Sequence, residues 1–470
     1  MAKRWRTWIS DRFGLRRVYE GTLNRRVAKS SWYYGDGATL TFLLGVLVVT
    51  GMFMSLTYTP SPDGAYESIR FITEKQVLGW FVRGLHYWAA GMMVVMLFFH
   101  LFRQILVGGY KFPREGTWLI GVILFFAIIL MSFTGYLLRW DERSIYALKV
   151  AQHMFSRLPW IGESVVVFIQ GGTEPGATTL TRLYAVHVIF VPVLLGLFVI
   201  WHIYLVIIHG VTSQEERNQP IYTASQQRQL YRAQARSREK GENFFPMTVF
   251  KSGLMATIVF AIVLTLTLTL GPQRLYPEAD LTTISRPIEE WWFYWYSGLI
   301  ALLPNTIAPW FVVIFPIVLF IILILLPFID RSPWRGFKKR LWPPIVVGIC
   351  VIGILYLTDL RRRSPWTGWP DSEPPPVPAG VVLSPEAEQG RQLFAQYGCN
   401  SCHPISGHGR KVAVDFGQIE RRLSQDYIRD YILQPPEGIA MPGYRGRMSA
   451  QDLERIVEFV LVAQTFPRSQ

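Results

Sequence analysis

Two apolar stretches each begin and end with histidine: HYWAAGMMVVMLFFH at residues 86–100 and HVIFVPVLLGLFVIWH at residues 187–202. The intervals within the two pairs are 14 and 15 residues. On an α-helix such an interval is about four turns, with a rise of roughly 21–22 Å, and its two ends face roughly the same way. Two such helices side by side would present two stacked bis-histidine sites at different depths of a bilayer.

These four histidines favour a haem-binding interpretation. Histidine is expensive inside a membrane span, and imidazole is a common axial ligand of haem iron. The alternative is that each histidine is a hydrogen-bonded polar residue in a helix bundle. Four of them at matching depths argue against that alternative.

Glycines support the haem interpretation independently. Gly37 and Gly51 are 14 residues apart, and so are Gly121 and Gly135, which repeats the histidine interval. A porphyrin edge packed against a helix requires a missing side chain, and glycine supplies it. Close packing between helices would explain single glycines but not the shared interval.

The composition indicates a membrane protein. The chain has 470 residues, of which 50% are hydrophobic, and 17 are tryptophan. This is too apolar for a soluble protein of this length. We predict an all-α fold with seven membrane spans, because most of the apolar segments reach the length that a hydrocarbon core requires. The spans cover about residues 38–58, 84–106, 117–138, 182–208, 250–271, 307–328 and 341–358.

Basic residues predict the orientation. Residues 1–30 carry nine Lys or Arg against two acids, and further basic residues cluster near 107–116, 210–247 and 329–340. These regions alternate correctly for one side of the membrane, which we predict to be cytoplasmic. The formal net charge of +14 is therefore topological, and nucleic-acid binding is not expected.

This topology assigns the histidines to two sites. The second and fourth spans both run from outside to inside. His86 and His187 are therefore predicted to bind an outer haem b, and His100 and His202 an inner one. Arg83 lies near the outer edge, where it would pair with a haem propionate or anchor the interface.

A second domain follows a proline-rich linker at residues 361–382. It contains Cys399-Asn-Ser-Cys402-His403, the attachment signature of a c-type haem, in which two thiols bind the porphyrin and the histidine binds the iron. The competing interpretation is a zinc or redox CxxC motif. Because such haem is attached outside the bacterial cytoplasm, the motif agrees with the predicted extracytoplasmic C-terminus.

The second axial ligand of this haem is predicted to be methionine. Met441 lies in a loop before an expected closing helix at 450–464, and Pro442 would fix that loop. Methionine paired with histidine is the usual choice in cytochromes c. Met448 is the rival ligand, and either methionine could instead serve only in packing.

The histidine pairs, together with Arg83-Gly-Leu-His86-Tyr-Trp and Thr134-Gly135-Tyr136-Leu-Leu-Arg-Trp140-Asp141, resemble the cytochrome b subunit of Rieske/cytochrome b quinol:cytochrome c reductases. The interval of 15 is similar to the cytochrome b6f type. The resemblance covers about residues 30–360, with the part after 248 similar to that family's separate subunit IV. The C-terminal domain resembles class I cytochromes c.

Charge, composition, motifs and this resemblance together divide the chain into six expected segments. They are a basic segment (1–30), a four-helix core for two haems (31–212), a cytoplasmic loop (213–247), a three-helix region (248–360), the linker (361–382) and the cytochrome c domain (383–470).

The resemblance also implies a quinol site. Residues 289–305 begin Glu289-Glu290-Trp291-Trp292 and resemble the family's Pro-Glu-Trp-Tyr motif, with Glu290 in the glutamate position. Quinol oxidation releases two protons, and a partly buried glutamate can accept one. The alternative is an interfacial glutamate in an aromatic belt. Loop 139–181 holds an amphipathic stretch expected to roof the site.

At the inner face the expectations rest on position alone. Glu20, Arg26 and His209 are candidates for a second quinone site. Members of the b6f type carry a cysteine for a further covalently held haem, and Gly35 stands at the position we take as equivalent. A third haem in the membrane would therefore have to be held without that bond.

The implied activity is that of a quinol–cytochrome c reductase in the bacterial cytoplasmic membrane. Two non-covalent haems b, one covalent haem c and quinone are the expected cofactors. A Rieske iron–sulfur protein, a further cytochrome c or other soluble electron acceptor, and a second copy of the chain are the expected partners. The alternative is a non-bifurcating dihaem anchor that connects a dehydrogenase or the quinone pool to haem c. A transporter with incidental histidines is a third hypothesis.

Overall fold

The computed structural model describes residues 8, 10, 12, 20, 23, 24, 26–29, 32–156, 158, 160–172, 175–236, 241–278, 290–303, 307–363, 374–407, 413–419, 422–436, 441, 443–446 and 448–466. The predicted all-α fold is confirmed, apart from one small antiparallel pair of strands, β1 (Arg26–Ala28) and β2 (Gly241–Asn243), in which Arg26 pairs with Asn243. The chain divides into two compact units. One contains residues 1–139, 153–275 and 305–353, and the other contains residues 140–152, 276–304 and 354–470.

Seven described helices are long and apolar enough to cross a membrane, as the hydropathy pattern predicted. The fourth span consists of α9, a π-helical turn and α10, and the fifth continues from a π-helical turn into α13. The helices are α3 (Asp36–Ser55), α5 (Gly79–Leu106), α6 (Glu115–Leu137), α9 (Ala177–Ala185), α10 (Val191–His209), α13 (Val249–Leu270), α15 (Ala308–Ile329) and α16 (Trp342–Arg363).

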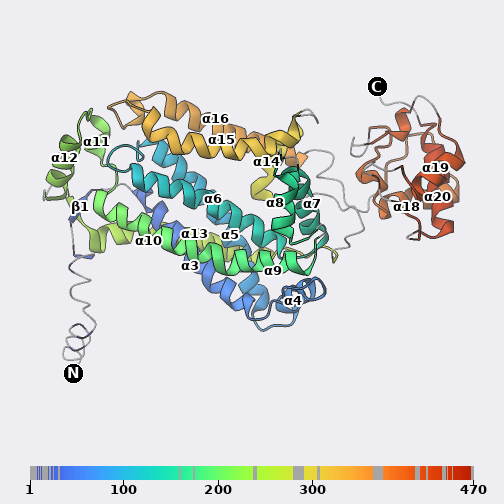
Figure 1. Ribbon diagram of the computed structural model, residues 1–470, viewed down its shortest axis with the longest axis horizontal. Coiled ribbons are helices and arrows are strands. Elements are labelled where there is room, and N and C mark those ends of the chain that lie inside the picture. The colour runs from blue at the N-terminus through green and yellow to red at the C-terminus, as the bar shows by residue number, and fades with distance from the viewer. Residues whose placement is uncertain are drawn as a thin grey trace. The chain divides into compact units, whose positions relative to one another are not determined.

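Most of the span surface is available to lipid. Helix α3 contacts α5, α13 contacts both of them, and α6 contacts α10 and α15 (Figure 1). The core among these helices includes Leu43, Met93, Phe125 and Val263. Outward-facing residues are also apolar, which is the pattern expected where the surrounding solvent is hydrocarbon.

A π-helical turn, Val186–Phe190, interrupts the fourth span. The N–H of Val191 donates to the carbonyl of Val186, five residues back, and Pro192 follows. Proline has no N–H and its ring collides with the carbonyl four residues before it, which favours a local bulge. One additional residue is thereby accommodated within the span.

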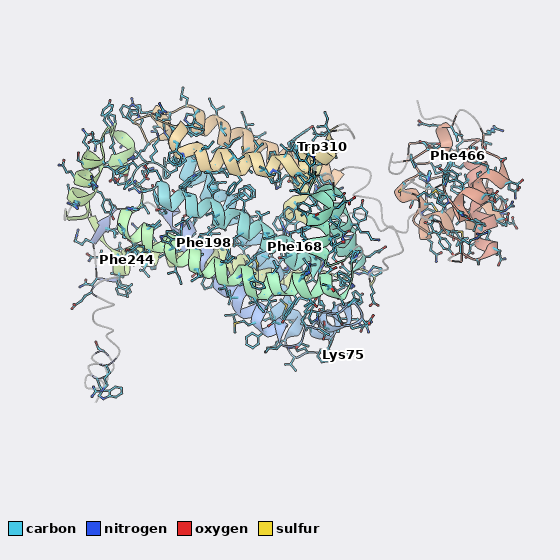
Figure 2. The ribbon with its side chains drawn as sticks, viewed as in Figure 1. Lys75, Phe168, Phe198, Phe244, Trp310 and Phe466 are labelled. Carbon is cyan, nitrogen blue, oxygen red and sulfur yellow. The ribbon has the colours of Figure 1, made fainter. Side chains whose placement is uncertain are left out.

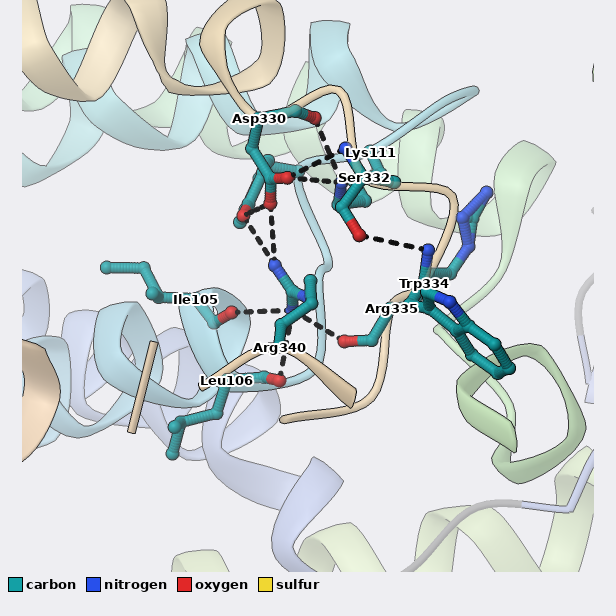
Figure 3. Close-up of polar contacts among 9 residues, drawn as sticks. Ile105, Leu106, Lys111, Asp330, Ser332, Trp334, Arg335 and Arg340 are labelled. Carbon is teal, nitrogen blue, oxygen red and sulfur yellow. Dashed lines mark hydrogen bonds and ion pairs between the residues drawn. The ribbon is translucent and has the colours of Figure 1, made fainter. Parts of the chain in front are cut away.

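Charged side chains join the loops at one end of the bundle. Arg340 bonds to Asp330 and to the carbonyls of Ile105 and Leu106, which close α5 onto the loop between α15 and α16 (Figure 3). Lys111 bonds to Asp330 and to the Ser332 carbonyl. We call Tyr110, Lys111, Asp330 and Arg340 the loop cluster.

Shorter helices lie outside the spans. They are α4 (Pro62–Glu74), α7 (Glu142–Ser156), α8 (Gly162–Gln170), α11 (Gln214–Asn218), α12 (Ala224–Arg236) and α14 (Tyr294–Ala301). Helices α7 and α8 occupy the loop expected to hold an amphipathic segment. Figure 2 shows the side chain of Phe168 on α8, which is 78% exposed, and that of Trp310 on α15, which is 42% exposed.

The C-terminal domain has its own core. Its helices are α18 (Pro385–Gln396), α19 (Gln425–Leu433) and α20 (Ala450–Ala463), each begun by a serine N-cap: Ser384, Ser424 and Ser449. The cap oxygen of each accepts a bond from a backbone N–H in the first turn, which stabilises the helix start. Phe394 of α18 packs on Phe459 of α20.

Candidate functional site

His86 on α5 and His187 in the π-helical turn face each other. Their ring centroids are 6.5 Å apart and the ring planes differ by 65°. A nitrogen ligand lies about 2 Å from its metal, so two axial imidazoles on one ion have centroids about 6 Å apart. The spacing of these two rings therefore fits ligation of a single iron.

The second pair lies further along the same two spans, with His100 on α5 and His202 on α10, the helix that continues from the π-helical turn. The π-helical turn explains why intervals of 14 and 15 residues give equivalent pairs, because it takes up the additional residue of the second interval. In an uninterrupted α-helix, an interval of 15 rather than 14 residues would rotate His202 about the helix axis by about 100°.

All four predicted glycines lie against the histidine rings. A Cβ built on Gly37 or Gly51 would lie 3.6 or 3.3 Å from Cε1 of His100 or His86. On Gly121 the distance to His202 Cε1 would be 3.2 Å, and on Gly135 the distance to His187 Cε1 would be 2.6 Å. The missing side chains make room for the imidazoles, and packing of a porphyrin edge against these glycines stays a prediction.

Three residues that the sequence argument did not single out bind or approach the histidines. Thr50 Oγ1 is 2.9 Å from His86 Nδ1, and Thr134 Oγ1 is 3.0 Å from His187 Nδ1. Asp36 Oδ2 is 3.2 Å from His100 Nδ1. The hydroxyls of Thr50 and Thr134 engage Nδ1 of His86 and His187, so Nε2 is the nitrogen that these two rings have left to ligate iron. Asp36 and Thr50 directly precede Gly37 and Gly51, so the 14-residue interval already contained a signal for both.

Arg83 is 8% exposed and ties three elements together. It donates to Thr73 Oγ1 on α4 at 3.0 Å and to the carbonyl of Gln273 beyond α13 at 2.7 Å. Its pairing with a haem propionate remains a prediction.

Glu290 is 4% exposed and directly precedes the short helix Trp291–Phe293, whose Trp292 is also buried. Two hydrogen bonds lie in the compact unit that contains Glu290. The N–H of Glu142 on α7 donates to the carbonyl of Pro277, and Arg361 donates to Ser297 on α14. Burial raises the pKa of Tyr296 above its ordinary value. Glu289, Pro304 and Asn305 lie outside the described residues.

The CxxCH segment follows α18. His403 stacks on Phe416 with ring centroids 4.7 Å apart, and its Nδ1 lies 3.0 Å from the carbonyl of Val414. A bond from Nδ1 to that carbonyl leaves Nε2 for iron. Cys399 and Cys402 are free thiols. Two thiols followed by an imidazole are the donor set that a c-type haem requires.

The structure places both candidate methionines on the same core. Met441 and Met448 each pack, partly buried, against the core of the C-terminal domain. The choice of Met441 as second axial ligand therefore stays a prediction, and Pro442 lies outside the described residues.

The inner-face candidates lie on separate elements. Glu20 is exposed, Arg26 of β1 donates to the carbonyl of Gly241, and His209 ends α10. A Cβ built on Gly35 would lie 3.1 Å from Ser252 Cα of α13. That helix therefore occupies the space beside Gly35, which does not fit a haem bonded at this position.

Comparisons with known proteins agree with this geometry. Residues 24–211 match the family described as cytochrome b/b6/petB, and residues 385–460 match the family described as cytochrome c oxidase, cbb3-type, subunit III. Cytochrome b6 of Cyanidium caldarium is 37% identical over 209 residues, which are 44% of this chain and 96% of that protein. The menaquinol:cytochrome c reductase cytochrome b subunit of Bacillus subtilis is 34% identical over 194 residues, which are 39% of this chain and 87% of that protein.

The chain belongs to the cytochrome b/b6 family and carries a C-terminal cbb3-type cytochrome c domain. These domains imply haem b and haem c, and the seven spans make the chain a multi-pass membrane protein. A solved structure described as hyperthermophilic respiratory Complex III has the same fold, with a TM-score of 0.66 at 24% identity, covering 84% of this chain and 95% of that chain.

Proposed function

We propose that this chain is the cytochrome b subunit of a quinol:cytochrome c reductase, fused to a haem c domain. The observation that carries the proposal is the pairing of His86 with His187, with His100 and His202 placed further along the same two spans. The named activity of the Bacillus subtilis relative supports it. In this proposal the paired histidines hold two haems b, and Cys399, Cys402, His403 and Met441 hold one haem c.

Each bound haem would supply one-electron redox chemistry, and the protein residues set where protons and quinol go. Quinol is oxidised at the outer face, where it loses two electrons and two protons. Glu290 accepts one of those protons, because a buried carboxylate beside aromatic side chains can take a proton and release it to water. One electron goes to an iron–sulfur partner of the Rieske type, and the other crosses the membrane to an inner quinone site.

The remaining features of the proposal follow from charge and composition. The basic N-terminal segment faces the cytoplasm and the haem c domain faces the opposite side. A Rieske partner is required because the sequence lacks a second cysteine and histidine set that would hold such a cluster. The functional unit is a homodimer within a multisubunit complex, and a soluble acceptor receives electrons from haem c.

Replacement of Glu290 by Gln tests the proposal. Gln keeps the size of the side chain but cannot accept the proton, so we expect quinol oxidation to fall by about 10²-fold, the lower end of what general-base removal costs. Haem content, read from reduced-minus-oxidised spectra, should be unchanged. Steady-state reduction of a soluble cytochrome by a quinol analogue provides the rate.

Glu278→Gln serves as the matched control, since Glu278 is an exposed glutamate in the same segment. It should leave turnover unaltered. Unchanged quinol oxidation in Glu290→Gln would favour the non-bifurcating anchor, which needs no outer proton acceptor.

A further inference from the structure

Asp36 is a fully buried carboxylate in the first turn of the first membrane span. Its Oδ1 accepts hydrogen bonds from the N–H of Gly37 at 2.7 Å and from Arg103 at 2.8 Å. Its Oδ2 accepts from Arg103 Nε at 2.6 Å and lies 3.2 Å from His100 Nδ1. A bidentate guanidinium of this kind fixes both the charge and the orientation of a carboxylate.

The four histidines therefore differ in what engages Nδ1. His86 and His187 each lie beside a neutral threonine hydroxyl. The ring of His202 approaches the backbone of Thr117, and no side chain among the described residues hydrogen-bonds to its buried Nδ1. Nδ1 of His100 likewise makes no hydrogen bond in the described part of the chain, but it alone of the four lies beside a carboxylate, with Asp36 Oδ2 at 3.2 Å.

We propose that Asp36 is a positioning residue that, together with Arg103, orients the imidazole of His100 and gives the inner b haem a lower midpoint potential than a hydroxyl partner would. This inference rests on the proposed function, in which His100 ligates iron. A carboxylate that accepts the Nδ1 proton makes the imidazole a more basic ligand. A more basic ligand stabilises the oxidised metal, and the buried negative charge acts in the same direction.

Arg103 limits the size of this effect. It is 7% exposed, and its positive charge offsets much of the charge on Asp36 at a distance. The 3.2 Å contact of Asp36 Oδ2 with His100 Nδ1 is local, so its effect on ligand basicity persists beside the ion pair. Asp36 should consequently influence one b haem and leave the outer one unaffected.

The test is a spectroelectrochemical titration of the complete complex carrying Asp36→Asn. We expect the midpoint potential of one b haem to rise, so that at its original midpoint the reduced-to-oxidised ratio increases about tenfold. The other b haem should titrate as before. Thr50→Val is the matched control, because Thr50 engages the outer ligand His86. Thr50→Val should shift only the midpoint potential of the b haem that Asp36→Asn leaves unchanged.

Two further measurements keep the proposal testable if Asp36→Asn is poorly assembled. The double variant Asp36→Asn with Arg103→Gln removes both buried charges and avoids an unpaired guanidinium. In the unaltered protein, pulsed EPR should show that the exchangeable Nδ1 proton of one b haem ligand is more strongly hydrogen-bonded than the others. Two b haems with unshifted potentials in the variants, or equivalent Nδ1 protons, would overturn the proposal. Absence of two b haems would instead contradict the proposed function.

Discussion

Gly135 leaves the least room of the four glycines beside the histidines. A Cβ there would lie 2.6 Å from Cε1 and 3.1 Å from Nε2 of His187, both closer than ordinary contacts. The hydroxyl of the neighbouring Thr134 engages Nδ1 of the same ring, which restricts how far the ring can move away. Any side chain at 135 therefore displaces a predicted iron ligand.

We accordingly expect Gly135→Ala to lose about half of the non-covalent haem. Forcing a methyl group into a packed site costs about 1–3 kcal/mol, and here the displaced atoms belong to the ligand. Pyridine haemochrome analysis of the extractable haem gives the content.

Gly37→Ala is the matched control, because its Cβ would lie 3.6 Å from His100 Cε1, an ordinary contact distance. It should retain the haem, and the better helix propensity of alanine should compensate for any crowding. Equal haem content in the two alanine variants would contradict the steric argument.

At the residue scale the sequence indicated the histidines and glycines but not their partners. The 14-residue interval is visible in one dimension, so the glycine pairs could be related to the histidine pairs before any coordinates, whereas the contact of each glycine with one histidine could not. The bonds of Thr50, Thr134 and Asp36 depend on how α3 and α6 are rotated against their neighbours. Hydropathy does not encode that rotation in helices that are apolar on every side.

At the element scale, the loop cluster holds the α15–α16 loop against the end of α5. Asp330 Oδ1 pairs with Lys111 at 2.9 Å, and its Oδ2 pairs with Arg340 at 2.7 Å and accepts a short bond from Tyr110. Burial alone would raise the pKa of Asp330, but the bonds from Tyr110 and Lys111 hold it below its ordinary value. The ionised carboxylate thus stabilises this closure.

Asp330→Asn should therefore destabilise the bundle of membrane spans by about 3 kcal/mol at neutral pH, since it leaves buried cations without their partner. A carboxylate whose pKa is lower in the folded protein than in the unfolded chain stabilises the fold at any pH above the unfolded pKa, which is about 3.9. That stability is lost as the pH falls through the pKa of the folded protein. In detergent, the thermal unfolding midpoint of the variant should lie well below that of the parent at pH 7. The difference between the two midpoints should become small below about pH 4. The exposed Glu67→Gln should show little difference at either pH. A difference in thermal midpoint that stays constant with pH would contradict an ionic role for Asp330.

Span positions were predictable because length and hydropathy suffice, yet the geometry of the fourth span was not. An ideal helix gives angular offsets of about −40° for 14 residues and +60° for 15. The π-helical turn at Val186–Phe190 removes that discrepancy. Pro192 was its one sequence signal, and proline alone does not distinguish a bulge from a kink.

At the scale of the whole molecule, the haem-binding residues are supported by separate cores. Leu43, Met93 and Phe125 belong to a core built from the membrane spans. Phe394, Ile456 and Phe459 belong to a core made entirely of residues between 377 and 466. The proline-rich linker and the polar sequence after it favour such a separation, since a polar segment cannot continue an apolar bundle.

Separate cores predict that the two kinds of haem are lost independently. Replacing both Cys399 and Cys402 by Ser removes the thiols that attach haem c, so the covalent haem should disappear while two extractable haems b per chain remain. Conversely, His187→Leu should reduce the extractable haem and leave the covalent haem in place, because the described residues of the C-terminal core all lie between 377 and 466. Acid–acetone extraction followed by pyridine haemochrome assay of both fractions measures the ratio, which should be two to one in the parent chain. Loss of haem b on removal of the two cysteines would show that the haem c domain is needed to assemble the membrane sites.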